Sequence, residues 1–304
     1  MKKVIAVTAL IAATTLALAG CAGGDALAGG GGNTKGSAGK QVIIGSADFT
    51  ESQLVASIYS EALKAAGVPV KEKFNIGSRE VYIAALQDGS IDLVPEYSGA
   101  MLKYLDPKSK ASNADDVTKE LKTKLPKGTS LLEASDAQDK DVLAVTKATA
   151  DKHHLKSISD LKAVAGKLSL GGPPEWKTRV NGVVGLKDIY GLNFKEFVSL
   201  DAGGPLTMTA LTSGQVQVGD IFSTDPGLTK NKLVALDDDK DLFAAENVVP
   251  VITAAKSSDL IVKTLGAVST KLTTNDLIAM NAQAATGTNP SDIAKKWLAS
   301  AGLS

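Results

Sequence analysis

Glu175 and Arg179 stand four residues apart, directly after the glycine- and proline-rich run at residues 171–174. If this segment is helical, the spacing places both charged side chains on the same face. The run follows a short apolar segment, and in open α/β sheets a strand that gives way to a helix in this manner faces a ligand crevice. The stretch therefore predicts one half of a site for a small polar molecule, with Arg179 as its main chemical group.

A similar opening occurs earlier in the chain, where the apolar segment 42–44 ends at Gly45 and polar residues follow. Two such openings suggest two similar lobes with one binding site between them. Polar residues at these and two further loop ends are candidate hydrogen-bonding groups for a ligand. They are Ser46, Asp48, Thr50, Ser98, Ser223, Thr224 and Asp225. Taken singly, each fits a helix cap or a turn equally well.

The two lobes share a further pattern. Segments 85–98 and 210–223 both contain an Ala-Leu pair, a glycine, a short apolar strand and an aromatic residue followed by serine. The aromatic residues are Tyr97 and Phe222. If each strand ends at the cleft, these two rings project from opposite walls; the alternative is that both are ordinary core aromatics.

The alternation of strand and helix patterns predicts an α/β protein. Segments 41–45, 68–74 and 91–94 are predicted strands, with helical apolar stripes between them. The first helix is expected to have Thr50 as its N-cap and Gln53 in the capping-box position. Strand and helix in alternation are typical of a mostly parallel sheet covered on both faces.

The same pattern returns after residue 159 and places the domain boundaries. Lobe one is predicted at residues 41–140 plus 249–304, and lobe two at 141–248. The crossings near residues 141–146 and 247–253 form the expected hinge. Three final helices, near residues 257–268, 274–286 and 290–301, are expected to pack on lobe one.

The amino-terminal segment has the pattern of a lipoprotein signal peptide. Lys2 and Lys3 precede an apolar run, and a small-residue cleavage motif leads to Cys21, the only cysteine. A lipid on Cys21 would anchor the protein on the extracytoplasmic face of the membrane. The alternative is a plain secretory peptide. Residues 21–40, rich in glycine and alanine, are expected to be a flexible tether.

Composition and motifs argue against several classes of function. The 33 Lys and Arg residues balance 33 Asp and Glu residues, whereas nucleic-acid binding favours a basic excess. His153 and His154 lie together in a Lys-rich segment, where they fit a surface role, and no Cys/His metal cluster is present. Enzyme motifs with a nucleophile, a phosphate loop or a zinc helix are absent. We therefore expect no metal, no cofactor and no catalysis.

Five motifs resemble a known family when taken together. They are GSADFTESQ (45–53), DLVPEYSG (92–99), GGPPEWKTR (171–179), LDAGGPLT (200–207) and IFSTDPG (221–227). In this order they are similar to the substrate-binding lipoproteins of osmoprotectant ABC importers, which take glycine betaine, carnitine, choline or proline betaine. The resemblance covers about residues 41–303. It implies a two-lobed periplasmic-binding-protein (Venus flytrap) fold, with a mixed, mostly parallel sheet flanked by helices in each lobe.

The resemblance also implies how a ligand is held and what the partners are. Aromatic faces hold a quaternary ammonium, and an arginine holds the carboxylate. Tyr97 and Phe222 match the family's aromatic positions, and Glu175 and Arg179 match its carboxylate-binding motif. Closure of the lobes would then present the ligand to a membrane permease driven by a cytoplasmic ATPase.

The sequence departs from the family pattern at four expected ligand positions. Ala47 replaces a lysine, Ala100 a threonine, and Asp141 and Glu246 stand where tyrosines are expected; Trp176 is a possible substitute ring. The two acids would suit a cation with N–H donors. The alternatives are therefore another small cation or zwitterion, such as a polyamine, an amino acid derivative or another onium compound, or a sensory lipoprotein without a transport role.

Overall fold

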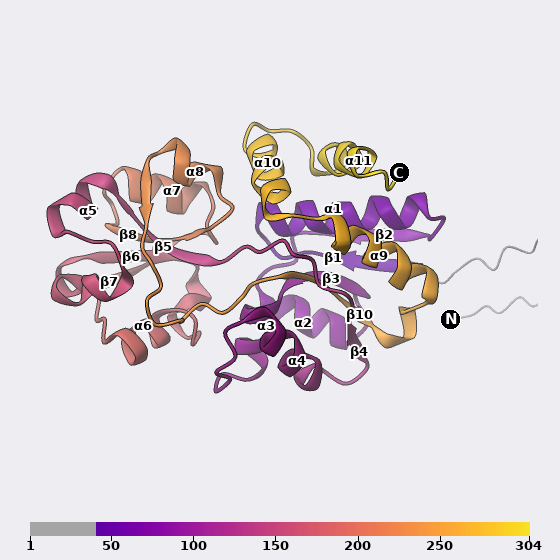
Figure 1. Ribbon diagram of the computed structural model, residues 1–304, viewed down its shortest axis with the longest axis horizontal. Helices are drawn as coiled ribbons and strands as arrows, with labels where there is room; N and C mark the ends of the chain where they lie inside the picture. Colours follow the sequence, from indigo (N-terminus) through magenta and orange to yellow (C-terminus); the bar gives the residue numbers. More distant parts are fainter. Residues whose placement is uncertain (1–40) are drawn as a thin grey trace, which may run out of the picture. The chain divides into compact units, whose positions relative to one another are not determined.

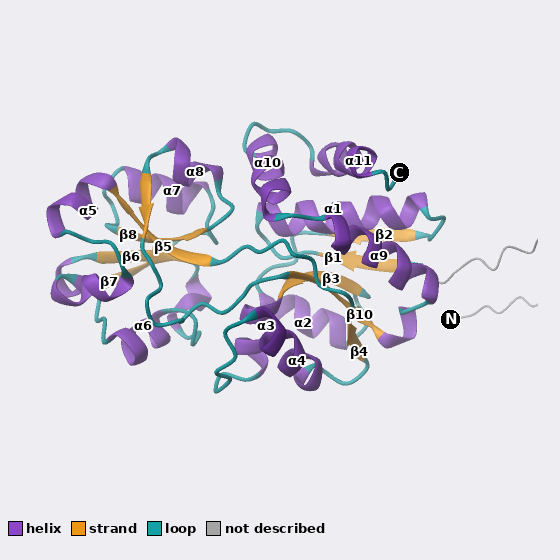
Figure 2. Ribbon diagram, viewed as in Figure 1, coloured by secondary structure: helices purple, strands orange, loops and turns teal. Residues whose placement is uncertain are grey.

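A computed structural model describes residues 41–304, which form two β-sheets covered by helices (Figures 1 and 2). The predicted signal peptide (1–20), the predicted tether (21–40) and the lipidation site Cys21 lie outside the described residues. We call the sheet with strand order β2-β1-β3-β10-β4, together with its helices, lobe one. The sheet with strand order β7-β6-β8-β5-β9, together with its helices, is lobe two.

Lobe one is a mixed sheet between two helical layers. Its strands are β1 (Val42–Gly45), β2 (Val70–Lys73), β3 (Leu93–Tyr97), β4 (Thr129–Leu131) and β10 (Val248–Thr253). Its helices are α1 (Thr50–Ala65), α2 (Arg79–Gln87), α3 (Ser98–Leu105), α4 (Ala114–Lys124), α9 (Asp259–Lys271), α10 (Thr274–Ala284) and α11 (Pro290–Ala301). Helices α1, α9, α10 and α11 cover one face and α2, α3 and α4 the other (Figure 1). The prediction that the three final helices pack on lobe one is confirmed.

Lobe two repeats this arrangement. Its strands are β5 (Asp141–Thr146), β6 (Ser169–Gly172), β7 (Glu196–Ser199), β8 (Val218–Phe222) and β9 (Leu233–Ala235). Its α-helices are α5 (Lys147–His153), α6 (Val183–Tyr190), α7 (Pro205–Thr212) and α8 (Pro226–Lys230). Short 3-10 helices cover residues 158–163, 165–167 and 174–177. The first two of these precede β6.

The two sheets share one topology, which confirms the predicted equivalence of the lobes. In each sheet the second strand in the order is parallel to both of its neighbours (β1 to β2 and β3; β6 to β7 and β8). In each, the fourth strand is antiparallel to the third (β10 to β3 in lobe one, β5 to β8 in lobe two). Tyr97 and Phe222 are the last residues of the equivalent strands β3 and β8.

The start of α1 differs from its prediction. Thr50 is the first helical residue, Phe49 occupies the N-cap position, and no side chain caps the helix. The hydroxyl of Ser52 instead accepts a hydrogen bond from the Ala47 backbone N–H, at 2.9 Å. This bond holds the loop after β1 against the first turn, and it turns Phe49 toward the opposite lobe.

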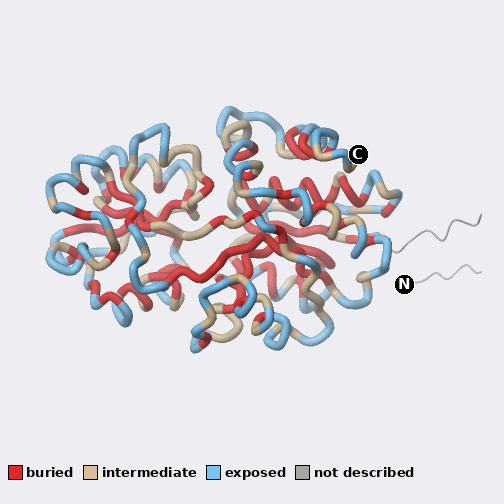
Figure 3. Tube along the Cα trace, in the orientation of Figure 1, coloured by how far each residue is buried: buried red, intermediate tan, exposed pale blue. Residues whose placement is uncertain are grey.

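Burial follows the strands, as Figure 3 shows, and the helices expose their outer faces. The crossing that returns to lobe one is also buried from residue 242 to 250. Among residues 41–304, no helix combines the length and the apolar character that a bilayer span requires.

Candidate functional site

A cleft with about 620 Å³ of empty space, part of it open to solvent, lies between the lobes. Lobe one lines it with the loop after β1, the first half of α2 and the end of β3. Lobe two lines it with the segment after β6 and with strands β5 and β8. The cleft therefore stands where the two strand ends meet, as the sequence pattern predicts.

Six of the residues predicted to bind a ligand line this cleft. They are Asp48, Tyr97, Asp141, Glu175, Arg179 and Phe222. The cleft is also lined by the four residues at which this sequence differs from the family pattern. They are Ala47, Ala100, Asp141 and Glu246. The departures therefore change the chemistry of the cleft itself.

The remaining predicted residues lie outside the lining and bond to protein groups. Ser46 donates to the Ala47 carbonyl at 2.9 Å and accepts from the Asn75 N–H at 2.8 Å. Ser98 donates to the Ala245 carbonyl at 3.0 Å and so holds the returning crossing. Asp225 caps α8 by accepting from the Gly227 N–H. These contacts match the cap and turn roles that the sequence left open, and a ligand contact by these residues stays a prediction.

Three aromatic rings form a continuous row across the cleft. The Phe49 ring centroid lies 5.8 Å from that of Tyr97 and 5.0 Å from that of Phe222. Phe49 thereby connects the two rings predicted to face each other. Trp176, 1% exposed, lines the cleft from lobe two and stacks on Phe243 at 6.2 Å.

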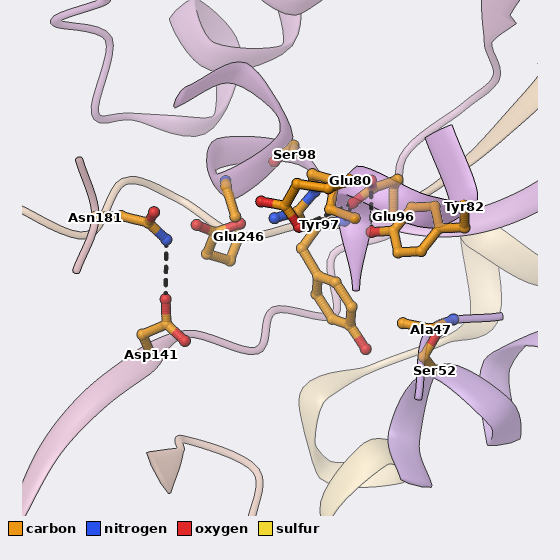
Figure 4. A network of polar contacts seen from close by, with 12 residues as sticks. Ala47, Ser52, Glu80, Tyr82, Glu96, Tyr97, Ser98, Asp141, Asn181 and Glu246 are labelled. Atoms are coloured by element: carbon orange, nitrogen blue, oxygen red, sulfur yellow. Dashed lines mark hydrogen bonds and ion pairs between the residues drawn. The ribbon is translucent and has the colours of Figure 1, made fainter. Parts of the chain in front are cut away.

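Glu51 is the centre of a buried network that joins the lobes. Its carboxylate accepts hydrogen bonds from the Thr224 hydroxyl of lobe two at 2.5 Å, from the Asn281 amide at 2.6 Å and from the Tyr97 hydroxyl at 2.8 Å. In Figure 4 the Tyr97 ring extends from β3 toward the start of α1. Thr224, predicted to face a ligand, is thus an interlobe contact, and Tyr97 presents its ring to the cleft while its hydroxyl is held.

Arg179, the predicted carboxylate ligand, forms an ion pair across the lobes. Its Nε and Nη2 donate to the two carboxylate oxygens of Glu80 on α2, at 3.1 and 2.8 Å. Glu175 lies 3.7 Å from the same Nη2. Partial burial acts against ionisation of Glu80, but hydrogen bonds from Arg179 and Ser78 lower the pKa of Glu80 to about 2. A ligand carboxylate would have to share or replace Glu80 at this guanidinium.

The second cation of the cleft, Arg79, is also held by a glutamate. Its Nε and Nη2 donate hydrogen bonds to the Glu96 carboxylate at 2.9 Å each. The Tyr82 hydroxyl and the Tyr97 N–H donate to the same carboxylate. Glu96 is fully buried. Both arginines of the lining are therefore neutralised by protein carboxylates before any ligand is considered.

Two other acids of the cleft, buried Glu246 and half-buried Asp141, are poorly compensated. Asp141 accepts one side-chain hydrogen bond, from the Asn181 amide at 3.1 Å, as Figure 4 shows, and Glu246 accepts from the Ala100 N–H at 2.8 Å. Burial raises the pKa of Asp141 to about 6, against the partly opposing fields of Arg179 and Arg79. Burial, reinforced by nearby Asp141, raises the pKa of Glu246 to about 8.

Two further acids complete this group. Burial and the neighbouring Glu51 raise the pKa of Asp139 well above its usual range, although it accepts hydrogen bonds from the Ser223 hydroxyl and the Thr224 N–H. Burial and Asp141 raise the pKa of Asp220 in the same way. Within residues 41–304, no group of His, Cys, Asp or Glu side chains has the arrangement of a metal site.

A pH dependence of stability follows from the raised pKa values. Between the unfolded and folded pKa of an acid, the folded state holds more protons, so stability falls as pH rises. Through Asp141 and Glu246, the free energy of unfolding should fall between about pH 4 and pH 8. Urea unfolding at several pH values measures this; the double variant Asp141→Asn/Glu246→Gln should show a flatter profile. A wild-type stability that rises across this window would contradict the assignment. Glu80 titrates below it and does not interfere.

Sequence reasoning missed several residues of the lining. Arg79, Tyr82 and Asp139 lie in segments with no resemblance to a site motif, and only the fold brings them to the cleft. Phe49 stands inside the GSADFTESQ motif (45–53), but the sequence alone assigned it no role. Asp220 had a usable signal, because it is a single acid in an otherwise apolar strand.

Known proteins resemble this chain over most of its length. The family model described as the substrate binding domain of an ABC-type glycine betaine transport system matches residues 40–300. A glycine-betaine-binding protein of Pseudomonas aeruginosa is 30% identical over 223 residues, 69% of this chain and 70% of that protein. A carnitine transport binding protein of Listeria monocytogenes is 27% identical over 300 residues, 93% of this chain and 91% of that protein. A crystal structure described as a glycine betaine/carnitine/choline ABC transporter superimposes with a TM-score of 0.68 at 23% identity, covering 86% of this chain and 99% of that one. That likeness confirms the two-lobed fold.

Proposed function

Because this chain belongs to the family of substrate-binding domains of ABC-type glycine betaine transport systems, we propose that it captures a small organic cation or zwitterion in the cleft between its lobes. The chain is the substrate-binding component of an ABC importer, and such components work with a membrane permease outside the cytoplasm. Quaternary-ammonium osmoprotectants such as glycine betaine are the first ligands to test, since the relatives named above bind glycine betaine and carnitine.

The charge of the cleft carries this proposal. Its two arginines are each held by a glutamate, at Glu80 and Glu96, while Asp141, Asp220 and Glu246 have no cationic partner. A buried, uncompensated carboxylate is costly, and a bound cation would offset that cost. The row formed by Phe49, Tyr97 and Phe222 offers π faces for the same charge, and Trp176 also lines the cleft.

Closure and delivery follow from contacts that both lobes make. The Glu51–Thr224 and Glu80–Arg179 bonds join lobe one to lobe two beside the cleft. A ligand that touches both walls would favour this joined state, and the joined state would be the form presented to the permease. We also propose that a lipid on Cys21 anchors the chain and that the ligand leaves chemically unchanged. Mass spectrometry tests both, through the acylated amino terminus and through the mass of the released ligand.

The direct test is a calorimetric titration of the purified protein with glycine betaine, carnitine and choline, followed by amines, polyamines and amino acids. We expect at least one organic cation to bind with a dissociation constant in the micromolar range or below, about −8 kcal/mol. Neutral sugars of similar size are the control and should not bind. If no cation in this panel binds, the proposed function is wrong.

Substitution of Arg179 should weaken binding of the carboxylate end of a zwitterionic ligand and leave binding of its cationic end nearly unchanged. Arg179→Met should weaken binding of glycine betaine by about 2–5 kcal/mol, the usual cost of truncating one half of a buried charge pair. Binding of choline, which has the same cation but no carboxylate, should change little. Since Glu80 is 41% exposed, loss of its pair with Arg179 should change the free energy of unfolding by only about 0–1 kcal/mol. Equal weakening of both ligands would show that Arg179 acts only by joining the lobes.

A further inference from the structure

Asp220 differs from every other acid of the cleft. It lies in the middle of β8, is 1% exposed and lines the cleft, yet neither of its carboxylate oxygens has a hydrogen-bond partner. Glu96, a buried acid on the equivalent strand β3 of lobe one, has four donors from Arg79, Tyr82 and Tyr97. Buried polar groups are almost always paired. The unpaired oxygens of Asp220 therefore point to a group that arrives from outside the chain.

The sheet places Asp141 beside this carboxylate. Asp141 pairs with Phe222 in the antiparallel ladder between β5 and β8, so Asp141, Asp220 and Phe222 share one face of the sheet. Residue 172 on the neighbouring strand β6 is glycine, and a Cβ there would lie 3.2 Å from the Cβ of Asp220 and 3.5 Å from the Trp176 ring. The side chains of Asp141, Asp220, Phe222 and Trp176 all line the cleft.

No group in residues 41–304 donates a hydrogen bond to Asp220. The charged groups that most affect its pKa are Asp141, Arg179, Asp139 and Glu175, and Arg179 is the only cation among these four. Nε and Nη2 of Arg179 bond to Glu80. The oxygens of Asp220 are therefore free to accept hydrogen bonds from donors outside residues 41–304.

A quaternary ammonium cannot supply them either. It can offset the charge of a carboxylate, but it has no N–H to donate, so the oxygens of Asp220 would stay without a hydrogen bond beside it. We propose that the cationic group of the ligand carries N–H donors, as a protonated primary, secondary or tertiary amine or a guanidinium does, and that Asp220 and Asp141 accept them. This inference rests on the proposed function and narrows its ligand class.

Ligand binding should then release a proton. Without a ligand, burial favours the protonated form of Asp220, whose pKa is raised. An N–H cation that bonds to Asp220 favours the carboxylate, and the displaced proton goes to the buffer. The measured binding enthalpy should therefore depend on the ionisation enthalpy of the buffer.

The first experiment compares ligands that differ by one methyl group. Pairs are glycine betaine with N,N-dimethylglycine, carnitine with its N-demethylated form, and choline with N,N-dimethylethanolamine, all titrated at neutral pH, where the tertiary amines are protonated. In at least one pair, the member with the N–H should bind ten times more tightly or better. Equal affinity, or tighter binding of the quaternary member, in every pair that binds would overturn the inference and leave the proposed function intact. No binding in any pair and no binding of other cations would overturn both.

The second experiment uses Asp220→Asn, which keeps shape and removes the charge. The preference for the N–H member should fall to less than threefold, and the buffer dependence of the enthalpy should disappear. The same variant should raise the melting temperature, because an unpaired buried acid is lost. Asp188→Asn, an exposed acid on α6 of the same lobe, is the matched control and should behave as the wild type. A lowered melting temperature with an unchanged ligand preference would show that Asp220 is structural, and the inference would be wrong.

Discussion

Replacing Arg79 by methionine should lower the free energy of unfolding by about 3–5 kcal/mol, the cost of leaving one member of a buried ion pair without its partner. Arg79 is 7% exposed and Glu96 is fully buried, and two parallel hydrogen bonds of 2.9 Å join them. Methionine retains most of the side-chain volume but removes every donor. Urea unfolding measures the change.

The double variant Arg79→Met/Glu96→Gln is the control for this prediction. It removes the unpaired charge of Glu96, so it should recover a substantial part of the lost stability. Recovery should be incomplete, because the Tyr82 hydroxyl and the Tyr97 N–H then donate to a neutral amide instead of a carboxylate. A single-variant loss below about 1 kcal/mol would mean that water reaches Glu96 and that the pair acts like a surface salt bridge.

Replacing Trp176 by alanine should cost about 3–5 kcal/mol of stability, the range for truncating a large buried aromatic side chain. Trp176 is the largest fully buried side chain of residues 41–304, and it packs in the core of lobe two against Phe243. It also lines the cleft, so the loss should be accompanied by weaker ligand binding. Thermal unfolding and calorimetry on the same sample measure the two effects.

Trp176→Phe separates packing from ligand contact. Phenylalanine fills much of the same space and should recover most of the stability. If Trp176 contacts the ligand cation, affinity should stay reduced even with stability recovered. Wild-type affinity in the phenylalanine variant would assign Trp176 to packing alone.

The sequence pattern was sufficient to predict the architecture because the two lobes repeat it. In lobe one, the apolar strands 42–45 and 93–97 end in a glycine and in an aromatic residue. The strands 169–172 and 218–222 of lobe two end in the same way, so the local pattern appears twice in the sequence. Short elements such as β4 and β9, three residues each, have too little periodicity to be recognised. The prediction that Thr50 is the N-cap of α1 was wrong, although threonine is a common N-cap residue. In the structure, the Ser52 hydroxyl accepts a hydrogen bond from the loop before the helix.

The site was only partly predictable, since its chemistry depends on pairing between distant residues. Arg179 could be recognised as a cleft cation, but its bond to Glu80 joins α2 to lobe two and leaves no trace in local sequence. The same holds for Glu51 and Thr224. Asp141 and Glu246 were noted as acids at unusual positions, yet only the structure shows that Asp220 stands beside Asp141 without a partner.

The fold is the one that family membership implies, and the chemistry of the cleft differs from the family pattern. Family membership accounts for the two sheets and the cleft between them. The residues at positions 47, 100, 141 and 246 change what the cleft can hold, since two are small and two are acidic. A cation smaller than a trimethylammonium, with hydrogens to donate, is consistent with both changes.

The most direct measurement is a crystal structure of the protein with N,N-dimethylglycine at saturating concentration. We predict the ligand in the cleft, its nitrogen about 2.7–3.2 Å from a carboxylate oxygen of Asp220 and its carboxylate toward Arg179. An empty cleft, or a ligand whose carboxylate rather than its nitrogen lies beside Asp220, would contradict the account.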